Sequence, residues 1–528
     1  MMKIMRRRVA VLVPLLGAGA LTLALRAQSP ATGAAAVAPG PVVATKAGRL
    51  RGIALTDPQV SLFKGIHYGQ STAGRARFMP PKPVAPWDGV KDATHFGDVC
   101  PQGGDTGRRS SEGAGLLPHS EDCLVLNVWT PGADTRRRPV MVWFHGRGFY
   151  AGAASERLYD GARLAKRGDL VVVTVNHRLN AFGYLYLGKA GGDRFKASGN
   201  AGVQDMQLAL EWVRDNIAGF GGDAGNVTIF GESGGGAKVS TLLGTPSARG
   251  LFTHAIIESG ARLSGIALAR ATKDAETVMA KLKVTTADQL QDLPIDTLLA
   301  AITETGRTTP DFGPVVDGAY LPADMFDPIA APSAAGIPVI VGTNREEYAL
   351  YARDHPKFGK PFSDADLRSD LAADFKNPGV EPLIAAYKES RPDATAWDLM
   401  VAIRSNRFHI SAIRLAEAQS RVAPTYQYSF DFAPTALGAA HSAEIAFVFS
   451  NATANPSARP GAKAVEDAMS DAWIAFARTG NPNHAGLPLW PRYDATTRAV
   501  MVFNATTAVV NDPRASERKI WEGKPVVR

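Results

Sequence analysis

A serine in a short glycine-rich motif is the residue of this sequence best suited to covalent chemistry. Residues 231–235, Gly-Glu-Ser-Gly-Gly, directly follow the apolar segment Val227–Phe230 and precede a stretch that favours a helix. When a G-x-S-x-G motif lies between a strand and a helix, its glycines allow a sharp turn that presents the serine hydroxyl. The pattern therefore predicts Ser233 as a nucleophile. Without the flanking elements it would indicate only a tight turn.

A serine nucleophile needs a histidine base and an acid that orients it, which follow in the order serine, acid, histidine in this kind of turn. The histidines beyond the acid candidates are His355, His409, His441 and His484. His409 lies in a segment that reads as a helix, and His484 lies in an Asn-Pro-Asn turn. His441 follows the expected strand 426–430 and a loop of small residues, where a base can be placed. We therefore predict His441 as the base.

Two adjacent carboxylates follow another expected strand. Val339–Val341 leads into residues 342–347, Gly-Thr-Asn-Arg-Glu-Glu, so either Glu346 or Glu347 could orient the histidine. Taken alone, each of these residues is more simply a surface charge. Three residue types in the required order, each at the end of a strand, favour the catalytic interpretation.

Backbone N–H groups for a developing oxyanion are expected from the loop 145–149, His-Gly-Arg-Gly-Phe, which follows the expected strand 140–144. Gly234, directly after the serine, would provide a further donor. One such donor contributes roughly 10²- to 10³-fold in rate.

The elements that must position these residues form a regular alternation. Short apolar runs rich in Val and Ile predict buried strands at 139–145, 170–176, 226–230, 254–259 and 337–342. Between the second and third, one helix face is indicated by Val203, Met206, Leu210, Val213 and Ile217. Strands alternating with helices predict an α/β fold, with a large, mostly parallel sheet covered by helices on both faces.

The N-terminus resembles a signal peptide. A basic start precedes the apolar stretch Val9–Leu25, and small residues follow near Ala27. We predict a cleaved leader at 1–27, a flexible spacer at 28–41, a single domain at 42–528, and a secreted or periplasmic protein without a stable membrane anchor. An uncleaved anchor is the alternative, although the apolar stretch is short for spanning a bilayer.

Charge and composition exclude other classes. The 528 residues are 45% hydrophobic and 20% charged, as in ordinary globular proteins. The leader supplies five of the eight net positive charges, so the rest of the chain shows no footprint for nucleic acid. The sequence contains no metal-ligand cluster or phosphate-binding loop, and we predict no metal and no cofactor.

The two cysteines, Cys100 and Cys123, favour one disulfide in an exported chain, with two buried thiols as the alternative.

Longer motifs are similar to those of the type-B carboxylesterase and lipase family of α/β-hydrolases. They cover nearly everything after the leader and include 65–68, 120–128, 216–233, 440–445 and 479–483. The resemblance implies the α/β-hydrolase fold and cleavage of small-molecule carboxylic esters through an acyl-enzyme. It implies Ser233 as nucleophile, His441 as base and Glu347, the second carboxylate, as acid. It also implies a disulfide between Cys100 and Cys123 and assigns the oxyanion positions to Arg147, Gly148 and Gly234.

Two residues depart from the family pattern. Alanine is usual where Gly234 stands, and glycine is usual where Arg147 stands. A guanidinium near the ester carbonyl could pair with a substrate carboxylate, so we hypothesise a preference for anionic esters. In the alternative, Arg147 points outward or pairs with an acidic neighbour such as Glu112. The competing function is a non-catalytic adhesion or binding protein on the same fold, and the complete triad argues against it.

Overall fold

The computed structural model describes residues 39–104, 117–304, 307–308 and 310–525. The predicted leader at 1–27 and most of the predicted spacer lie outside these residues. A strand, β1 (Pro39–Ala44), already begins inside the spacer segment 28–41, because its backbone pairs antiparallel with β2 (Arg49–Thr56). The described residues from Pro39 onward form one compact unit.

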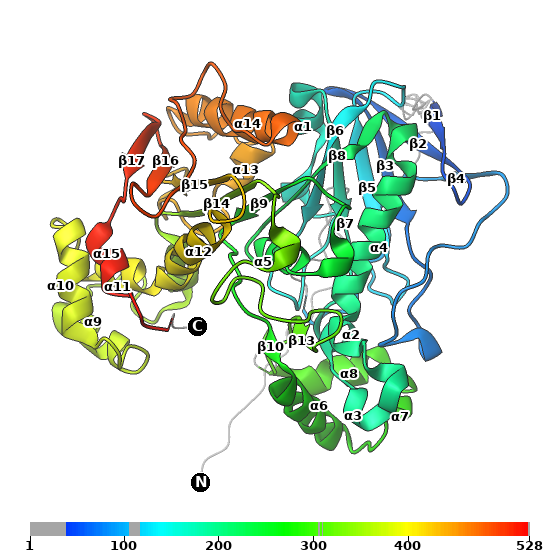
Figure 1. The fold of residues 1–528 in the computed structure, drawn as a ribbon, viewed down its shortest axis with the longest axis horizontal. Helices are drawn as coiled ribbons and strands as arrows, with labels where there is room; N and C mark the ends of the chain where they lie inside the picture. The colour runs from blue at the N-terminus through cyan, green and yellow to red at the C-terminus, as the bar shows by residue number, and fades with distance from the viewer. Residues whose placement is uncertain (1–38, 105–116, 305–306, 309, 526–528) are drawn as a thin grey trace, which may run out of the picture. The chain divides into compact units, whose positions relative to one another are not determined.

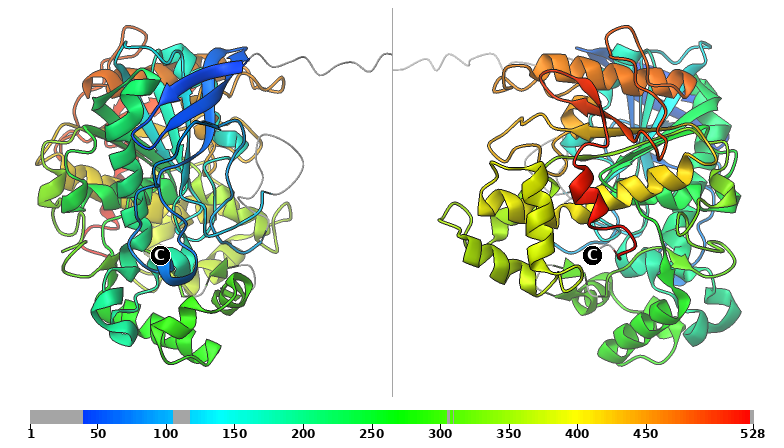
Figure 2. Two further views of the ribbon diagram at one scale, coloured as in Figure 1. Left: turned by 90° about the vertical axis from the view of Figure 1, so that its right-hand side faces the viewer. Right: turned by 60° about the vertical axis from the view of Figure 1, so that its left-hand side comes forward.

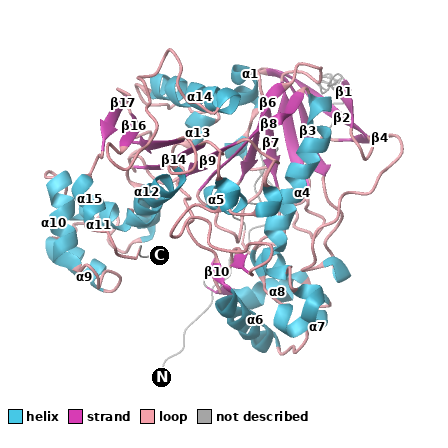
Figure 3. Ribbon diagram, in the orientation of Figure 1, coloured by secondary structure: helices cyan, strands magenta, loops and turns pink. Residues whose placement is uncertain are grey.

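The main sheet has thirteen strands within the described residues (Figures 1 and 3). Their order is β1, β2, β3 (Gln59–His67), β5 (Val125–Thr130), β7 (Val171–Val175), β6 (Arg138–Phe144), β8 (Gly222–Glu232), β9 (His254–Glu258), β14 (Val339–Asn344), β15 (Thr425–Phe430), β16 (Ala499–Phe503) and β17 (Ala508–Asn511), with β4 (Val90–Asp92) beside β2. Two-stranded pairs join β10 (Ile266–Ala267) with β13 (Val315–Val316) and β11 (Thr303–Glu304) with β12 (Arg307–Thr308).

The sheet is parallel from β7 to β16. The flanking pairs are antiparallel except that of β4 with β2, so the sheet is mixed overall and parallel at its centre. The predicted strands are all present. Since the carboxyl ends of parallel strands lie at one edge of a sheet, the loops after β6, β8, β14 and β15 converge there, which is the arrangement expected for a binding site.

Helices cover both faces of the sheet. In β6, Val142 packs in a core with α4 (Ala201–Asn216), α5 (Gly234–Leu243) and α12 (Asn406–Gln419). The next residue, Trp143, packs in a second core with α1 (Ala162–Gly168), α13 (Ile445–Val448) and α14 (Ala462–Thr479). Adjacent residues face opposite sides of a strand, which explains why the parallel strands are apolar throughout. The predicted amphipathic helix corresponds to α4.

Most of the remaining helices contribute to the first core or form a separate one. A third core unites α9 (Asp364–Ala372), α10 (Val380–Ser390) and α11 (Ala396–Arg404), which the right view of Figure 2 shows gathered together in yellow. Shorter or separate helices are α2 (Asn180–Tyr184), α3 (Gly188–Gly191), α6 (Leu268–Leu282), α7 (Ala287–Gln291), α8 (Ile295–Ile302) and α15 (Ala515–Lys519). Among the described residues, no helix has both the length and the hydropathy required to cross a bilayer.

Candidate active site

Ser233 lies at the turn between β8 and α5, as the motif predicts. Its backbone has φ 56° and ψ −120°, and its N–H donates to the carbonyl oxygen of Glu258 at 2.8 Å. A non-glycine residue with this φ carries a conformational cost, which persists only where the surrounding structure enforces it. The side chain is half-buried at the carboxyl end of the parallel strands.

The glycines of the motif allow this turn to pack against the neighbouring strand. A Cβ on Gly235 would lie 2.0 Å from the carbonyl oxygen of Phe144, and a Cβ on Gly231 would lie 2.6 Å from the same atom. Any side chain at either position would therefore force β8 and α5 away from β6. The glycines are required by close backbone approach.

His441 and Glu347 are brought together by the loops after β15 and β14. The Nδ1 atom of His441 is 2.6 Å from Oε2 of Glu347, and both side chains are buried. The second carboxylate oxygen, Oε1, accepts the backbone N–H of Asn344 at 2.8 Å. The Asn344 side chain also donates to the carbonyl oxygen of Ala440 at 2.7 Å. With Nδ1 donating to the carboxylate, Nε2 is the nitrogen available to accept a proton.

Glu346, the other candidate acid, has a different contact. Its Oε2 accepts the backbone N–H of Ala439 at 2.9 Å, and its Oε1 lies 3.0 Å from Nε of Arg345. Glu346 thus holds the loop that leads to His441 and does not contact the imidazole. The structure separates the two carboxylates that the residue pattern had left equivalent.

His441 and Ser233 are not hydrogen-bonded to each other in the structure. Within the described part of the chain, Nε2 of His441 has no hydrogen-bond partner, and it lies 3.2 Å from Oε1 of Glu232. Such bonds are often long before substrate binds and shorten in the complex. The structure therefore shows the contact between Glu347 and His441 but not the hydrogen bond between His441 and Ser233.

Glu232 is a site residue that the sequence reasoning missed. Its Oε1 accepts the hydroxyl of Ser442 at 2.8 Å. Burial raises the pKa of Glu232 well above its usual range against that hydrogen bond, and the charge of Glu347 raises it further. Glu232 therefore places beside Nε2 of His441 a carboxyl group whose protonated form is favoured by burial. A charged residue at the end of an otherwise apolar strand was the signal available in the sequence.

Arg147 lies in the loop 145–149 with φ 64°, and Gly148 follows with φ 59°. For an arginine this left-handed conformation costs on the order of 1 to 2 kcal/mol. Its Nε donates to Oε1 of Glu156 and its Nη2 donates to Oε2, each at 3.2 Å. The neighbour suggested from sequence, Glu112, lies outside the described residues, and Glu156 is the acidic partner that the structure shows.

Lys238 is a second residue that the sequence reasoning did not single out. It lies on α5, is fully buried, and donates from Nζ to the carbonyl oxygen of His145 at 2.7 Å. Burial lowers its pKa well below the usual range, although the charge of Glu156 opposes the shift. A single lysine inside the apolar stretch 234–243 was the signal that could have identified it.

The disulfide between Cys100 and Cys123 is formed, as expected. It closes a loop whose residues 105–116 are not described. Next to the bridge, the side chain of Gln102 accepts the backbone N–H of Gly152 at 2.9 Å and donates to the carbonyl oxygen of the same residue at 3.1 Å. These contacts connect the disulfide loop to the segment that follows the loop 145–149.

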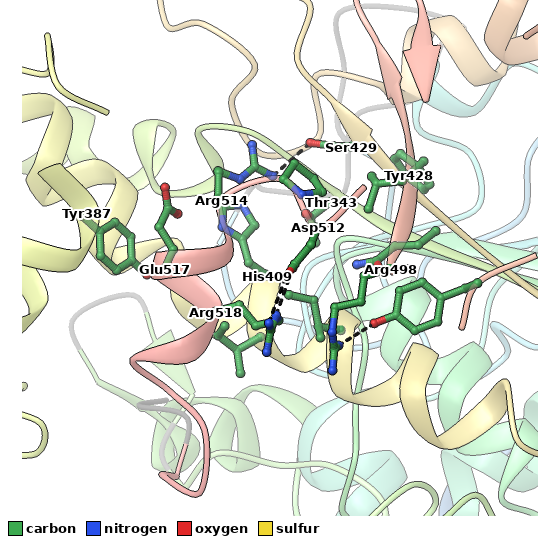
Figure 4. Close-up of a pocket in the computed structure, with 16 residues that line it drawn as sticks. Thr343, Tyr387, His409, Tyr428, Ser429, Arg498, Asp512, Arg514, Glu517 and Arg518 are labelled. Atoms are coloured by element: carbon green, nitrogen blue, oxygen red, sulfur yellow. Dashed lines mark hydrogen bonds and ion pairs between the residues drawn. The ribbon is translucent and has the colours of Figure 1, made fainter. Parts of the chain in front are cut away.

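A small polar cavity of about 40 Å³ lies beside β14 and β15, apart from the loops described above (Figure 4). Its arginines pair within the protein: Arg518 with Asp512, and Arg514 with Ser429. His409, on a helix as predicted, is hydrogen-bonded through Nε2 to the carbonyl oxygen of Asn344 at 2.8 Å, and burial lowers its pKa to about 4. The hydrogen bond from His409 fixes the last residue of β14, Asn344.

Known proteins are similar to this chain over most of its length. The sequence profile of the Carboxylesterase family matches residues 39–521. A para-nitrobenzyl esterase of Bacillus subtilis is 36% identical over 90% of this chain and 98% of its own length, and a liver carboxylesterase of Sus scrofa is 34% identical over 88% of this chain and 90% of its own.

Solved structures give the same result. A carboxylesterase of Geobacillus stearothermophilus superposes with a TM-score of 0.80 at 39% identity, covering 91% of this chain and 99% of its own. An esterase of Clostridium hathewayi that can hydrolyse aliphatic aromatic polyesters superposes with a TM-score of 0.74 at 33% identity, covering 92% and 98%. The chain therefore belongs to the carboxylesterase family, on the α/β-hydrolase fold, and is a carboxylic ester hydrolase.

Proposed function

We propose that this hydrolase cleaves esters through an acyl-enzyme on Ser233, with His441 as the base and Glu347 as the orienting acid. The single observation that carries the proposal is the 2.6 Å contact between His441 Nδ1 and Glu347 Oε2, beside a serine at a strand-to-helix turn. A buried carboxylate at Nδ1 holds the imidazole in the tautomer whose Nε2 can accept a proton.

The proton transfers follow from that tautomer. Nε2 of His441 takes the hydroxyl proton of Ser233 while the serine oxygen bonds to the ester carbonyl carbon. When the tetrahedral intermediate collapses, the bond to the alkoxy oxygen breaks, and His441 gives its proton to the departing alcohol. Water then attacks the acyl-enzyme with the same histidine as base, and releases the acid and free Ser233. The carboxylate of Glu347 stabilises the imidazolium formed in each step.

The negative charge of the tetrahedral intermediate needs hydrogen-bond donors. We assign this role to the backbone N–H groups of Arg147, Gly148 and Gly234. A Cβ on Gly146, in the loop 145–149, would lie 3.7 Å from Cβ of Ser233, and Gly234 directly follows the serine as the first residue of α5. Donors that are fixed before the reaction stabilise the oxyanion without reorganisation.

A covalent label tests the nucleophile directly. After incubation with an activated fluorophosphonate and digestion, mass spectrometry should find the phosphonyl group on Ser233, and activity should fall in proportion to labelling. Labelling of another serine in step with the loss of activity would contradict the assignment. Ser240, on the same helix but bonded to the carbonyl oxygen of Gly236, is the internal control and should stay unlabelled.

The preference for anionic esters stays a hypothesis with one opposing observation. Arg147 is paired with Glu156, so a substrate carboxylate would have to compete with a carboxylate of the protein. The test compares Arg147→Gly with the wild type on two matched substrates. One is a monoester of a dicarboxylic acid, which keeps a free carboxylate, and the other is its neutral analogue, in which that carboxylate is methylated. The hypothesis expects a selective loss of activity on the anionic ester, and an equal change on both would contradict it.

We also propose export with removal of residues 1–27, which is supported by the basic start and the apolar stretch that follows it. N-terminal sequencing of the protein from the medium or periplasm should begin just after residue 27. An intact Met1 on the active protein would contradict the proposal. The comparisons give no support to the alternative of a non-catalytic adhesion protein.

A further inference from the structure

The backbone of Gly148 occupies the space in which a side chain at position 234 would lie. A Cβ on Gly234 would be 2.3 Å from both the nitrogen and the carbonyl oxygen of Gly148, and 2.5 Å from its Cα. Non-bonded carbon atoms normally stay about 3.5 to 4.0 Å apart. Because the contact is with backbone, no rotamer change relieves it. A side chain at 234 fits only if the loop 145–149 moves away from α5.

An ion pair holds this loop from outside. Arg147, next to Gly148, presents two guanidinium nitrogens to the two oxygens of Glu156, each at 3.2 Å. The Glu156 side chain is largely buried, with 12% exposed. Two parallel contacts fix orientation as well as distance. The pair therefore opposes a shift of the loop away from α5.

The side chain of a buried lysine restrains the loop 145–149 from the side of α5. Lys238 lies on α5, five residues after Ser233, and its Nζ donates to the carbonyl oxygen of His145 at 2.7 Å. The same Nζ lies 5.6 Å from the centre of the Phe149 ring. A buried lysine is costly unless its hydrogen bonds are made. Here Nζ donates to the carbonyl oxygen of His145 and, at 3.5 Å, to that of Gly146, and no ion pair with a carboxylate is seen among the described residues.

We propose that Lys238 and the Arg147–Glu156 pair are positioning residues for the oxyanion hole. They hold the loop 145–149 against the start of α5, which brings the N–H groups of Gly148 and Gly234 together and makes glycine necessary at 234. The inference rests on the proposed function, because it assigns these donors to the oxyanion. Positions 147 and 234 are then coupled: the loop fixed through Arg147 fills the space that a side chain at 234 would need.

The first experiment replaces Lys238 with methionine, which keeps the length of the side chain and removes the hydrogen bond to His145. We measure kcat, KM and the inhibition constant of a trifluoromethyl ketone, which forms a tetrahedral adduct with an oxyanion. We expect kcat and the affinity for the ketone to fall together by about 10- to 100-fold, with KM little changed, because only the oxyanion is affected. Lys189→Met, on an exposed lysine, is the matched control.

A purely structural role for Lys238 predicts a lower melting temperature with kcat and ketone affinity unchanged below it, and that result would overturn the proposal for this residue. If Lys238→Met does not fold, the outer contact still tests the inference. Gly234→Ala alone should lower kcat by about 10-fold or more, because the new Cβ displaces the donors. In the Arg147→Gly background the same Gly234→Ala change should lower kcat by a smaller factor than in the wild type, because the loop 145–149 is then no longer held against α5 by the ion pair.

A Gly234→Ala variant as active as the wild type, or a double variant whose losses simply add, would overturn the coupling between positions 147 and 234. Failure of the proposed function is recognised separately. If Ser233→Ala is inactive while Gly234→Ala is unaffected, only this inference fails. If Ser233→Ala stays active, the proposed function itself fails.

Discussion

Glu347 accepts a hydrogen bond from Nδ1 of His441 across 2.6 Å, although the two residues are 94 positions apart in the chain. Its second oxygen is held by the N–H of Asn344, so the carboxylate has one fixed orientation. The neighbouring Glu346 is fastened to Ala439 instead. Adjacent carboxylates in one turn thus have separate tasks, one on the imidazole and one on the loop that carries it.

We therefore predict that Glu347→Gln lowers kcat by about 10²- to 10⁴-fold, because a glutamine cannot stabilise the imidazolium and permits the wrong tautomer. Glu346→Gln is the matched variant and should leave kcat nearly unchanged, since its amide oxygen can still accept the N–H of Ala439. Steady-state hydrolysis of a para-nitrophenyl ester measures both. If Glu346→Gln had the larger effect, Glu346 and not Glu347 would be the acid that orients His441.

The buried side chain of Glu258 should make the free energy of unfolding depend on pH. It is fully buried; burial raises its pKa from 4.5 to about 8, against the hydrogen bond from Nε1 of Trp473 at 2.8 Å. Since the folded pKa is the higher one, the stability from its protonated form is complete below about pH 4.5 and is lost as the pH rises to about 8. Glu258→Gln stays neutral. Its unfolding free energy relative to wild type should rise by roughly 1.4 kcal/mol per pH unit across that window.

Urea unfolding of wild type and Glu258→Gln at pH 5 and pH 8 checks this prediction. The glutamine variant should gain most at pH 8, where wild type unfolds to an ionised carboxylate. A difference in unfolding free energy that is the same at both pH values would mean that Glu258 does not titrate in this window.

The disulfide predicts a measurable contribution to stability. Without reductant, the denatured protein should contain no thiol that reacts with a thiol reagent, and reduction should release two. Replacing Cys100 and Cys123 with serine should lower the unfolding free energy by about 3 kcal/mol, because the unfolded chain loses the constraint of the closed loop. Two free thiols in the unreduced protein would contradict the prediction.

The sequence was sufficient for the elements whose signal is local. β6, β7, β8, β9 and β14 are short apolar runs bounded by turn residues, and α4 has a regular apolar spacing, so each was predicted within a few residues. Ser233 could be predicted as a nucleophile because its motif depends only on the strand before it and the helix after it. His441 could be predicted as the base because few histidines follow a strand and a loop of small residues.

The rest depends on contacts between distant segments. Composition and spacing did not separate Glu346 from Glu347, because the direction of each side chain is set by Asn344 and Ala439. That Glu156 is the acidic partner of Arg147 could not be read from the sequence, because it depends on the turn after the loop, which brings Glu156 back onto Arg147. Lys238 was missed because an isolated lysine in a helix normally faces solvent, and only the packing of α5 against the loop 145–149 places it inside.

The most direct test of the account is the rate of Ser233→Ala on an activated aryl ester, with Ser240→Ala as the control. Removing the only hydroxyl at the turn between β8 and α5 should lower kcat by about 10⁴-fold or more with little effect on thermal stability, whereas the control should stay active. A Ser233→Ala protein that keeps more than about a tenth of the wild-type kcat would contradict the assignment of Ser233 as the nucleophile.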